Sequence, residues 1–250
     1  MSGRWQRYSE PESAAEACAR YTAGLLDEAV SRQGRATFAI SGGSTPKLLF
    51  ERLASREVRW DRVHFFWVDE RPVPPDDPQS NYRLAREHLL LPARVPPQNV
   101  HRIEGERPPE EAAQRYVEEI RDFFRLGSAE LPRFDVVQCG LGVDGHTASL
   151  FPGSPLLEDR DRIAAAVYAE TPRQWRVTLL PGALLAAGHT VFLVTGEDKA
   201  RAVRNTFNEP YNPRRYPAQI ASGDDVVWFL DQAAAGLLET PTDRDARQER

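Results

Sequence analysis

Apolar positions along the chain alternate between helix-like and strand-like spacing. Between Pro11 and Gln33 they recur three and four residues apart, which predicts an amphipathic helix. Arg35–Ile40 predicts a strand, and Lys47–Ser55 predicts the helix that follows its loop. Val63–Val68 is continuously apolar, as expected of a strand buried on both faces of a parallel sheet.

The same alternation continues toward the C-terminus. Ser80 predicts the cap of a helix running to about Leu90, and residues 109–126 predict another helix. Further strands are expected at Phe134–Cys139, Arg176–Leu180, Val191–Thr195 and Val226–Leu230, and further helices at Pro181–Ala187, Asp198–Thr206 and Gln232–Leu237. This order predicts an α/β fold, a doubly wound and mostly parallel sheet with helices on both faces.

No internal repeat and no linker-like segment interrupts this pattern. A length of 250 residues suits one large domain. We therefore expect a single α/β domain over residues 1–239. Residues 240–250 are polar and are expected to form a disordered tail.

Composition and charge restrict the possible partners. The formal net charge is -5, which argues against nucleic acid as a partner. No apolar run approaches about 18 residues, so no membrane span is expected. The first residues contain no apolar signal-peptide core, which favours a cytoplasmic protein. We expect this protein to be a monomer or a small homo-oligomer.

Four candidate motifs follow predicted strands, at the edge where parallel sheets bind ligands. In the first, Gly42 and Gly43 allow the backbone to approach an anion. Ser44 and Thr45 add hydroxyls at a helix N-terminus, which favours phosphate. A plain strand-to-helix turn with a Ser/Thr cap would show the same pattern.

Two other motifs carry cations. Arg71 follows Asp69 and Glu70, so it can bind phosphate by two hydrogen bonds, although a solvated loop with ion pairs is the alternative. Of the 32 basic residues only Lys47 and Lys199 are lysines. Lys199 begins a predicted helix, where a cation is unfavourable unless an anion is present; an exposed lysine is the alternative.

The fourth motif is the glycine-rich stretch around His146. A neutral imidazole accepts a proton from water near pH 7, and Asp144, two residues earlier, is placed to orient it. The other four histidines fit structural positions. No metal site is expected, because the histidines and the two cysteines, Cys18 and Cys139, lack ligand spacing, and Cys139 is expected to be buried.

Six stretches together resemble the glucosamine-6-phosphate isomerase/6-phosphogluconolactonase family, and in particular its lactonases. They are SGGSTP (41–46), FWVDERPVPPDDPQSN (66–81), GLGVDGHTASLFP (140–152), RVT (176–178), TGEDK (195–199) and VVWFLDQAAA (226–235). The resemblance implies a NagB-like, Rossmann-like fold. It also implies hydrolysis of 6-phospho-D-glucono-1,5-lactone in the oxidative pentose phosphate pathway, with no required metal or cofactor.

The resemblance also implies residue roles. His146 would be the general base. The residues facing the phosphate or sugar would be Gly42, Gly43, Ser44, Thr45, Asp69, Arg71, Asn81, Arg176 and Lys199. One departure is the stretch 173–175, Arg-Gln-Trp, where a more proline-rich and basic segment is expected.

Two other functions fit the same motifs. A glucosamine-6-phosphate deaminase resembles this family, but its pattern has an acid shortly after the Asp-Gly-His segment. Residues 147–152 of this chain contain none, and Arg71 stands where the deaminase pattern has Tyr. A non-catalytic sugar-phosphate sensor is the second alternative, and the presence of both His146 and Asp69 argues against it.

Overall fold

The main sheet of the computed structural model is parallel throughout. The structure describes residues 4–170, 173–221, 223 and 225–238. Within them, the seven strands of this sheet lie in the order β1 (Arg4–Tyr8), β10 (Val226–Asp231), β9 (His189–Val194), β6 (Val136–Cys139), β2 (Ala36–Ile40), β3 (Val63–Trp67) and β5 (Val100–His101). Each neighbouring pair is parallel, which confirms the expected fold class.

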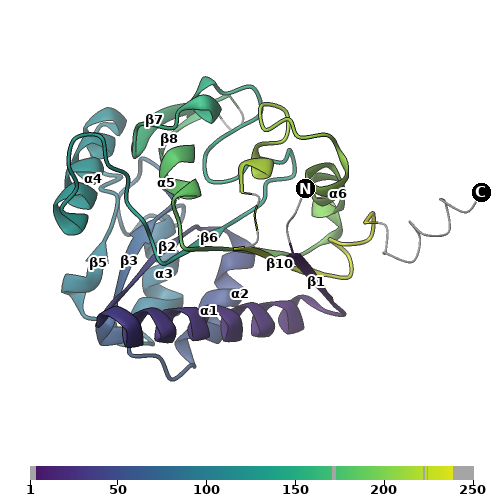
Figure 1. Cartoon of the computed structure of the whole chain (residues 1–250), viewed down its shortest axis with the longest axis horizontal. Helices are drawn as coiled ribbons and strands as arrows, with labels where there is room; N and C mark the ends of the chain where they lie inside the picture. The colour runs from purple at the N-terminus through teal and green to yellow at the C-terminus, as the bar shows by residue number, and fades with distance from the viewer. Residues whose placement is uncertain (1–3, 171–172, 222, 224, 239–250) are drawn as a thin grey trace, which may run out of the picture.

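Helices cover both faces of this sheet (Figure 1). The lower face in that view carries α1 (Pro11–Gln33) and α2 (Ser44–Ala54), which pack against each other. The upper side carries α5 (Pro181–Leu185) and α6 (Ala200–Asn208). The two remaining helices are α3 (Asn81–Ala85) and α4 (Pro109–Phe124). The bounds of α1 agree with the prediction, because its long apolar stripe is a local signal.

A small antiparallel sheet lies above the main one. Its strands are β4 (Asp69–Glu70), β8 (Gln174–Leu179) and β7 (Ala164–Ala169), with Asp69 opposite Thr178. The strand expected at 176–180 therefore forms, but it does not join the parallel sheet. The reason is that β4 leaves the main sheet directly after β3 and offers its own edge to β8. Helix α4 packs against β7 and β8.

Three further expectations need correction. Helix α2 begins at Ser44, three residues earlier than predicted, because Gly43 takes a φ of 116° that leads directly into it. The helix after Ser80 is capped by Ser80 and runs to Leu90 as predicted, but only Asn81–Ala85 is an α-helix, and Arg86–Leu90 forms a π turn. No helix forms at 232–237; these residues make turns in which the Ala235 N–H donates to the Asp231 carbonyl (3.0 Å).

The core lies between the helices and the main sheet. Phe192 of β9 and Trp228 of β10 stack with ring centroids 3.7 Å apart, and Phe38, Phe65 and Phe66 are fully buried on β2 and β3. Such continuous burial explains the unbroken apolar runs of these strands. Among the described residues, no helix is long and apolar enough to cross a membrane.

The chain reverses its direction of strand addition between β2 and β6. From β2 it proceeds to β3 on one side, whereas β6, β9 and β10 follow on the other side. Loops at the carboxyl ends of the two central strands therefore diverge and leave a crevice. This switch point is where α/β sheets bind ligands.

Candidate active site

The crevice at the switch point contains most of the predicted site residues. Its described lining consists of residues Ser41–Pro46, Asp69, Arg71, Asn81, Gly140–Gly142, His146, Ala148, Leu193, Val194 and Lys199. The loops after β2 and β6 are joined at their base: the Ser41 N–H donates to Oε1 of Gln138 (2.9 Å), and the Ser41 hydroxyl donates to the Gln138 carbonyl (3.1 Å). Gln138 lies on β6 and is fully buried, so this contact holds the loop that begins at Ser41 against β6.

The N-terminus of α2 forms one wall of the crevice. Gly43 precedes the helix, and Ser44 and Thr45 are its first residues. Backbone N–H groups in a first helical turn have no partner within the helix, and the helix dipole adds positive potential. The Thr45 hydroxyl lies 3.2 Å from the hydroxyl of Thr195, at the end of β9. This wall therefore suits an anion.

Asn81 and Arg71 form a second wall. The Asn81 amide donates to the carbonyl of Asp69 (2.8 Å) and to Oδ1 of its carboxylate (3.3 Å). Arg71 donates to Oδ1 of Asn81 and to the carbonyl of Gln79 (2.8 Å). This amide requires glycine at position 42, since a Cβ there would lie 1.7 Å from Oδ1 of Asn81.

Asp69 is held by two loops that are distant in sequence. It is 8% exposed, and its Oδ2 accepts a hydrogen bond from the buried hydroxyl of Ser149 (2.6 Å). The Ser149 N–H in turn donates to the hydroxyl of Thr178 on β8 (3.1 Å). Asp69 is the only carboxylate among the described lining residues of the crevice.

Arg176 lies in an adjoining compartment rather than in the crevice itself. This compartment shares Arg71 and Ser44 with the crevice, and Lys47 and Arg173 also line it. Burial, and then the positive charge of Arg71, lowers the pKa of the Arg176 guanidinium. Arg176 donates to the side chain of Gln174 and to the carbonyl of Trp175. The hydrogen-bond acceptors of Arg71 and of Arg176 are all neutral groups, so the positive charges of both arginines are available to an anion.

His146 is fixed by the loop after β6. Its Nδ1 lies 2.6 Å from Oδ1 of Asp144, and its backbone N–H donates to the same oxygen (3.1 Å). Burial raises the pKa of the Asp144 carboxyl, but hydrogen bonds from His146 outweigh this and hold its pKa below its usual value. Because a carboxylate accepts the proton on Nδ1, the neutral ring has its free lone pair on Nε2.

Lys199 stands at the start of α6, in the loop after β9. The preceding Gly196 takes a φ of 100°, and its N–H donates to both carboxylate oxygens of Asp231 (3.0 and 3.2 Å). Asp231 is buried at the end of β10. The ammonium of Lys199 lies 3.6 Å from the carboxylate of Asp198.

The structure thus brings the four predicted motifs together at one edge of the sheet, with Arg176 beside them. Sequence reasoning did not assign roles to four buried groups that hold these motifs: Glu70, Gln138, Ser149 and Asp231. Gln138 and Asp231 are single polar residues in apolar strands, which is a signal that could have marked them, whereas Glu70 and Ser149 stand among the other polar residues of their motifs and carry no separate signal. Cys139 is buried as expected, and burial raises the pKa of its thiol to about 12.

The sheet and its switch-point crevice place the chain in the Rossmann-like class of α/β proteins. A family model described as glucosamine-6-phosphate isomerases/6-phosphogluconolactonase matches residues 9–228. The chain belongs to this family, as the motifs suggested. Within the described residues, no group of three or more His, Cys, Asp or Glu side chains is placed to hold a metal ion.

Similar proteins cover nearly the whole chain. A 6-phosphogluconolactonase of Synechocystis is 39% identical over 215 residues, which are 85% of this chain and 89% of that protein. One from Rattus norvegicus is 34% identical over 247 residues, 95% of this chain and 94% of its own length. Relatives over most of the chain are thus named as enzymes, which confirms that the chain is an enzyme.

Solved structures agree with this assignment. The structure of 6-phosphogluconolactonase from Trypanosoma brucei matches with a TM-score of 0.85 at 29% identity, covering 95% of this chain and 99% of that chain. A monomeric glucosamine-6-phosphate deaminase matches with a TM-score of 0.80 at 19% identity, covering 94% of this chain and 99% of its own. At that identity the second match shows the shared fold alone.

Proposed function

We propose that this enzyme hydrolyses 6-phospho-D-glucono-1,5-lactone to 6-phospho-D-gluconate, a step of the oxidative pentose phosphate pathway. The names of its relatives support this substrate. The observation that carries the proposal is that His146, with Nδ1 bound to Asp144, lines the same crevice as the helix N-terminus at Ser44. Opening a lactone needs only a positioned water, a base and stabilisation of the oxyanion.

The proposed reaction uses His146 as general base. Nε2 takes a proton from a water molecule as the water oxygen attacks the lactone carbonyl carbon. The bond from that carbon to the ring oxygen then breaks, and the imidazolium returns its proton to the departing ring oxygen. Asp144 orients the ring and stabilises the positive charge that the ring carries between the two steps.

The phosphate would bind at the opposite wall. Arg71 and Arg176 line the adjoining compartment and have neutral hydrogen-bond acceptors, and Lys199 lines the crevice together with Arg71. The N-terminus of α2, with Gly42, Gly43, Ser44 and Thr45, adds unpaired backbone donors. Binding energy from this remote group orients the ring for attack by water.

Asp69 and Asn81 would contact the sugar hydroxyls. Both residues line the crevice together with His146 and Arg71. A deaminase mechanism is less well supported, because it uses an acid after the Asp-Gly-His segment and residues 147–152 contain none. Asp69 is held instead by Ser149 and Asn81.

The first test is His146→Ala. Turnover of the phosphorylated lactone should fall by about 10²–10⁴-fold while the fold is retained, because general base catalysis contributes that much. Product is measured by a coupled assay, with spontaneous lactone hydrolysis subtracted and circular dichroism as the folding control. Turnover equal to wild type would remove His146 from the mechanism, and ammonia release from glucosamine 6-phosphate would favour the deaminase.

The remaining expectations concern the whole enzyme. It is expected to act in the cytoplasm as a monomer or small homo-oligomer, with residues 1–239 as one domain. Residues 239–250, which include the predicted tail, lie outside the described part of the chain. Gel filtration and limited proteolysis check the oligomeric state and the domain boundary.

A further inference from the structure

Glu70 lies between two site residues but outside the crevice. Side chains alternate along a strand, so Asp69 and Arg71 face the crevice while Glu70 faces the other way. It is 2% exposed. A buried carboxylate without a cation among its hydrogen-bond partners is costly, so the contacts that it makes need an explanation.

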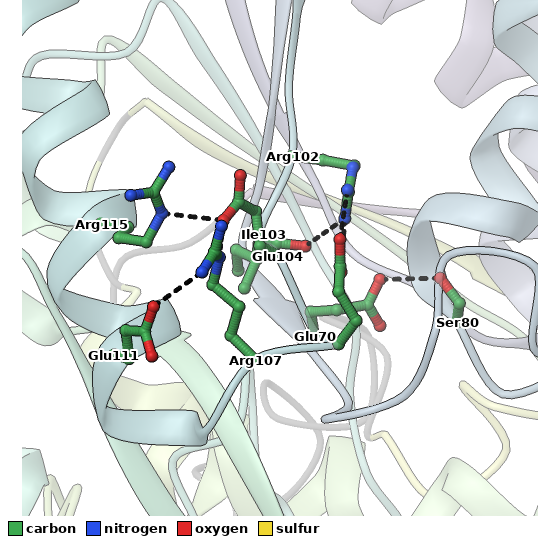
Figure 2. A network of polar contacts seen from close by, with 9 residues as sticks. Glu70, Ser80, Arg102, Ile103, Glu104, Arg107, Glu111 and Arg115 are labelled. Atoms are coloured by element: carbon green, nitrogen blue, oxygen red, sulfur yellow. Dashed lines mark hydrogen bonds and ion pairs between the residues drawn. The ribbon is translucent and has the colours of Figure 1, made fainter.

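The Glu70 carboxylate accepts four hydrogen bonds. Its Oε1 accepts from the backbone N–H groups of Arg71 (2.8 Å) and Asn81 (2.8 Å). Its Oε2 accepts from the N–H of Tyr82 (2.8 Å) and the hydroxyl of Ser80 (3.1 Å), the latter drawn in Figure 2. Burial raises the pKa of this carboxyl, and the three backbone donors work in the opposite direction.

These four donors come from the two ends of one loop. The loop between Arg71 and Ser80 contains four prolines, which have no N–H to donate. Its own backbone bonds are short turns, such as Asp77 N–H to the Pro74 carbonyl (3.0 Å). Glu70 therefore ties the backbone where the loop begins to the backbone where it ends. It does so beside the side-chain bonds of Asn81 to the Asp69 carbonyl and of Arg71 to the Gln79 carbonyl.

A second contact holds the backbone of Arg71 from the other side. A Cβ at Gly105 would lie 2.4 Å from the Arg71 carbonyl oxygen, so the two backbones are in close contact. The segment around Gly105 is itself braced by ion pairs of Glu104 with Arg107 and Arg115, which are drawn in Figure 2. The backbone of Arg71 is thus held at its N–H by Glu70 and lies in close contact with this segment at its carbonyl.

We propose that Glu70 is a positioning residue for substrate binding, because it holds the Arg71 guanidinium and the Asn81 amide at the crevice without touching the substrate. This role rests on the proposed function of Arg71 and Asn81. A role of Glu70 in binding is distinct from the chemical step, because His146 and Asp144 stand on the loop after β6, whereas the hydrogen bonds of Glu70 hold Arg71 and residues 80–82.

The test is Glu70→Gln, which keeps the shape and replaces one oxygen by an amide nitrogen. The amide nitrogen takes the place of either Oε1 or Oε2, and it cannot accept a hydrogen bond. The two hydrogen bonds that this oxygen accepts in the wild-type protein are therefore lost. We expect KM for the phosphorylated lactone and the Kd for 6-phosphogluconate to rise by about 10- to 100-fold, with kcat within about threefold of wild type.

Asp135→Asn is the matched control. The Asp135 carboxylate accepts from the N–H (2.9 Å) and the hydroxyl (2.8 Å) of Thr37 and from the side chain of Gln33 (2.7 Å), at the opposite edge of the sheet. Both variants should lose stability in thermal unfolding, but only Glu70→Gln should weaken binding. A folded Glu70→Gln with wild-type KM and Kd, or an equal loss in Asp135→Asn, would overturn the proposal.

A double-mutant cycle separates positioning from general destabilisation. If Glu70 acts through Arg71, then Glu70→Gln should weaken 6-phosphogluconate binding much less in an Arg71→Ala background than in wild type. Additive losses would contradict this role. The binding measurement also separates the two proposals. If Glu70→Gln weakens binding but the wild-type protein shows no lactone turnover, only the proposed lactonase function is rejected. If the wild-type protein turns over the lactone and Glu70→Gln leaves binding unchanged, only the proposed role of Glu70 is rejected.

Discussion

At the residue scale, the position of His146 depends on Gly142, which has no Cβ atom. A Cβ at Gly142 would lie 2.1 Å from Nδ1 of His146 and 2.7 Å from Oδ1 of Asp144. The Gly142 N–H also donates to the His146 carbonyl (2.8 Å), which closes the loop on itself. The sequence predicts that glycines tighten this loop, but only the folded loop shows which of them makes room for the imidazole.

Gly142→Ala should therefore displace the imidazole. Because a misplacement of about 1 Å can cost 100-fold in rate, we expect kcat to fall by about 10- to 100-fold, with KM near that of wild type. Steady-state kinetics on the phosphorylated lactone measures this. Gly24→Ala in α1 is the control, since a Cβ there meets nothing within 4 Å. Unchanged kcat in Gly142→Ala would show that the ring tolerates the methyl group.

At the element scale, buried acceptors hold the loops that follow the strands. Gln138 at the end of β6 holds the loop of Ser41, Glu70 on β4 holds the loop of Arg71, and Asp231 at the end of β10 holds the loop of Gly196. The loops themselves could be predicted from their glycines and prolines. The buried side chains that accept hydrogen bonds from these loops could not be predicted, because a polar residue in a strand pattern does not show which backbone N–H group it will contact.

Asp231→Asn tests one of these contacts. The carboxylate accepts from the N–H groups of Gly196 and Ala234, and an amide nitrogen in its place cannot accept. The loop carrying Lys199 should loosen, so KM for the phosphorylated lactone should rise by about 10- to 100-fold, since a lost hydrogen bond to a charged group has about this effect. Unphosphorylated glucono-1,5-lactone should be affected much less; equal losses on both substrates would contradict the role of Lys199.

At the scale of the whole molecule, a chain of side chains far from the crevice links stability to pH. Nδ1 of His64 lies 3.1 Å from Nε2 of His101, whose Nδ1 lies 2.6 Å from Glu119. Burial first, and then the charges of His101 and Arg35, lowers the pKa of His64 to about 4. In the unfolded chain this pKa is about 6.5, so the unfolded state binds more protons between the two values.

Stability should therefore fall as the pH decreases from about 6.5 to about 4. The full shift corresponds to about 3 kcal/mol, and partial exposure of His64 reduces the expected loss to about 1–2 kcal/mol. Urea unfolding at pH 7 and pH 4.5 measures it, and His64→Gln should make this decline shallower. His88→Gln, on the π turn after α3, is the control; an equal effect of both variants would contradict the assignment.

The sequence by itself did not indicate β1, β5 or β7, but it determined five of the strands of the parallel sheet, most of the helices and the four loops that carry the site. These follow from apolar periodicity and from glycine and proline positions, which act over a few neighbouring residues. Only the tertiary structure decided that β8 turns back against β4, which brings Arg176 to Arg71, and that Glu70, Gln138 and Asp231 hold the loops. Such contacts join segments that can lie about 100 residues apart in sequence, so they depend on strand register and packing rather than on local pattern.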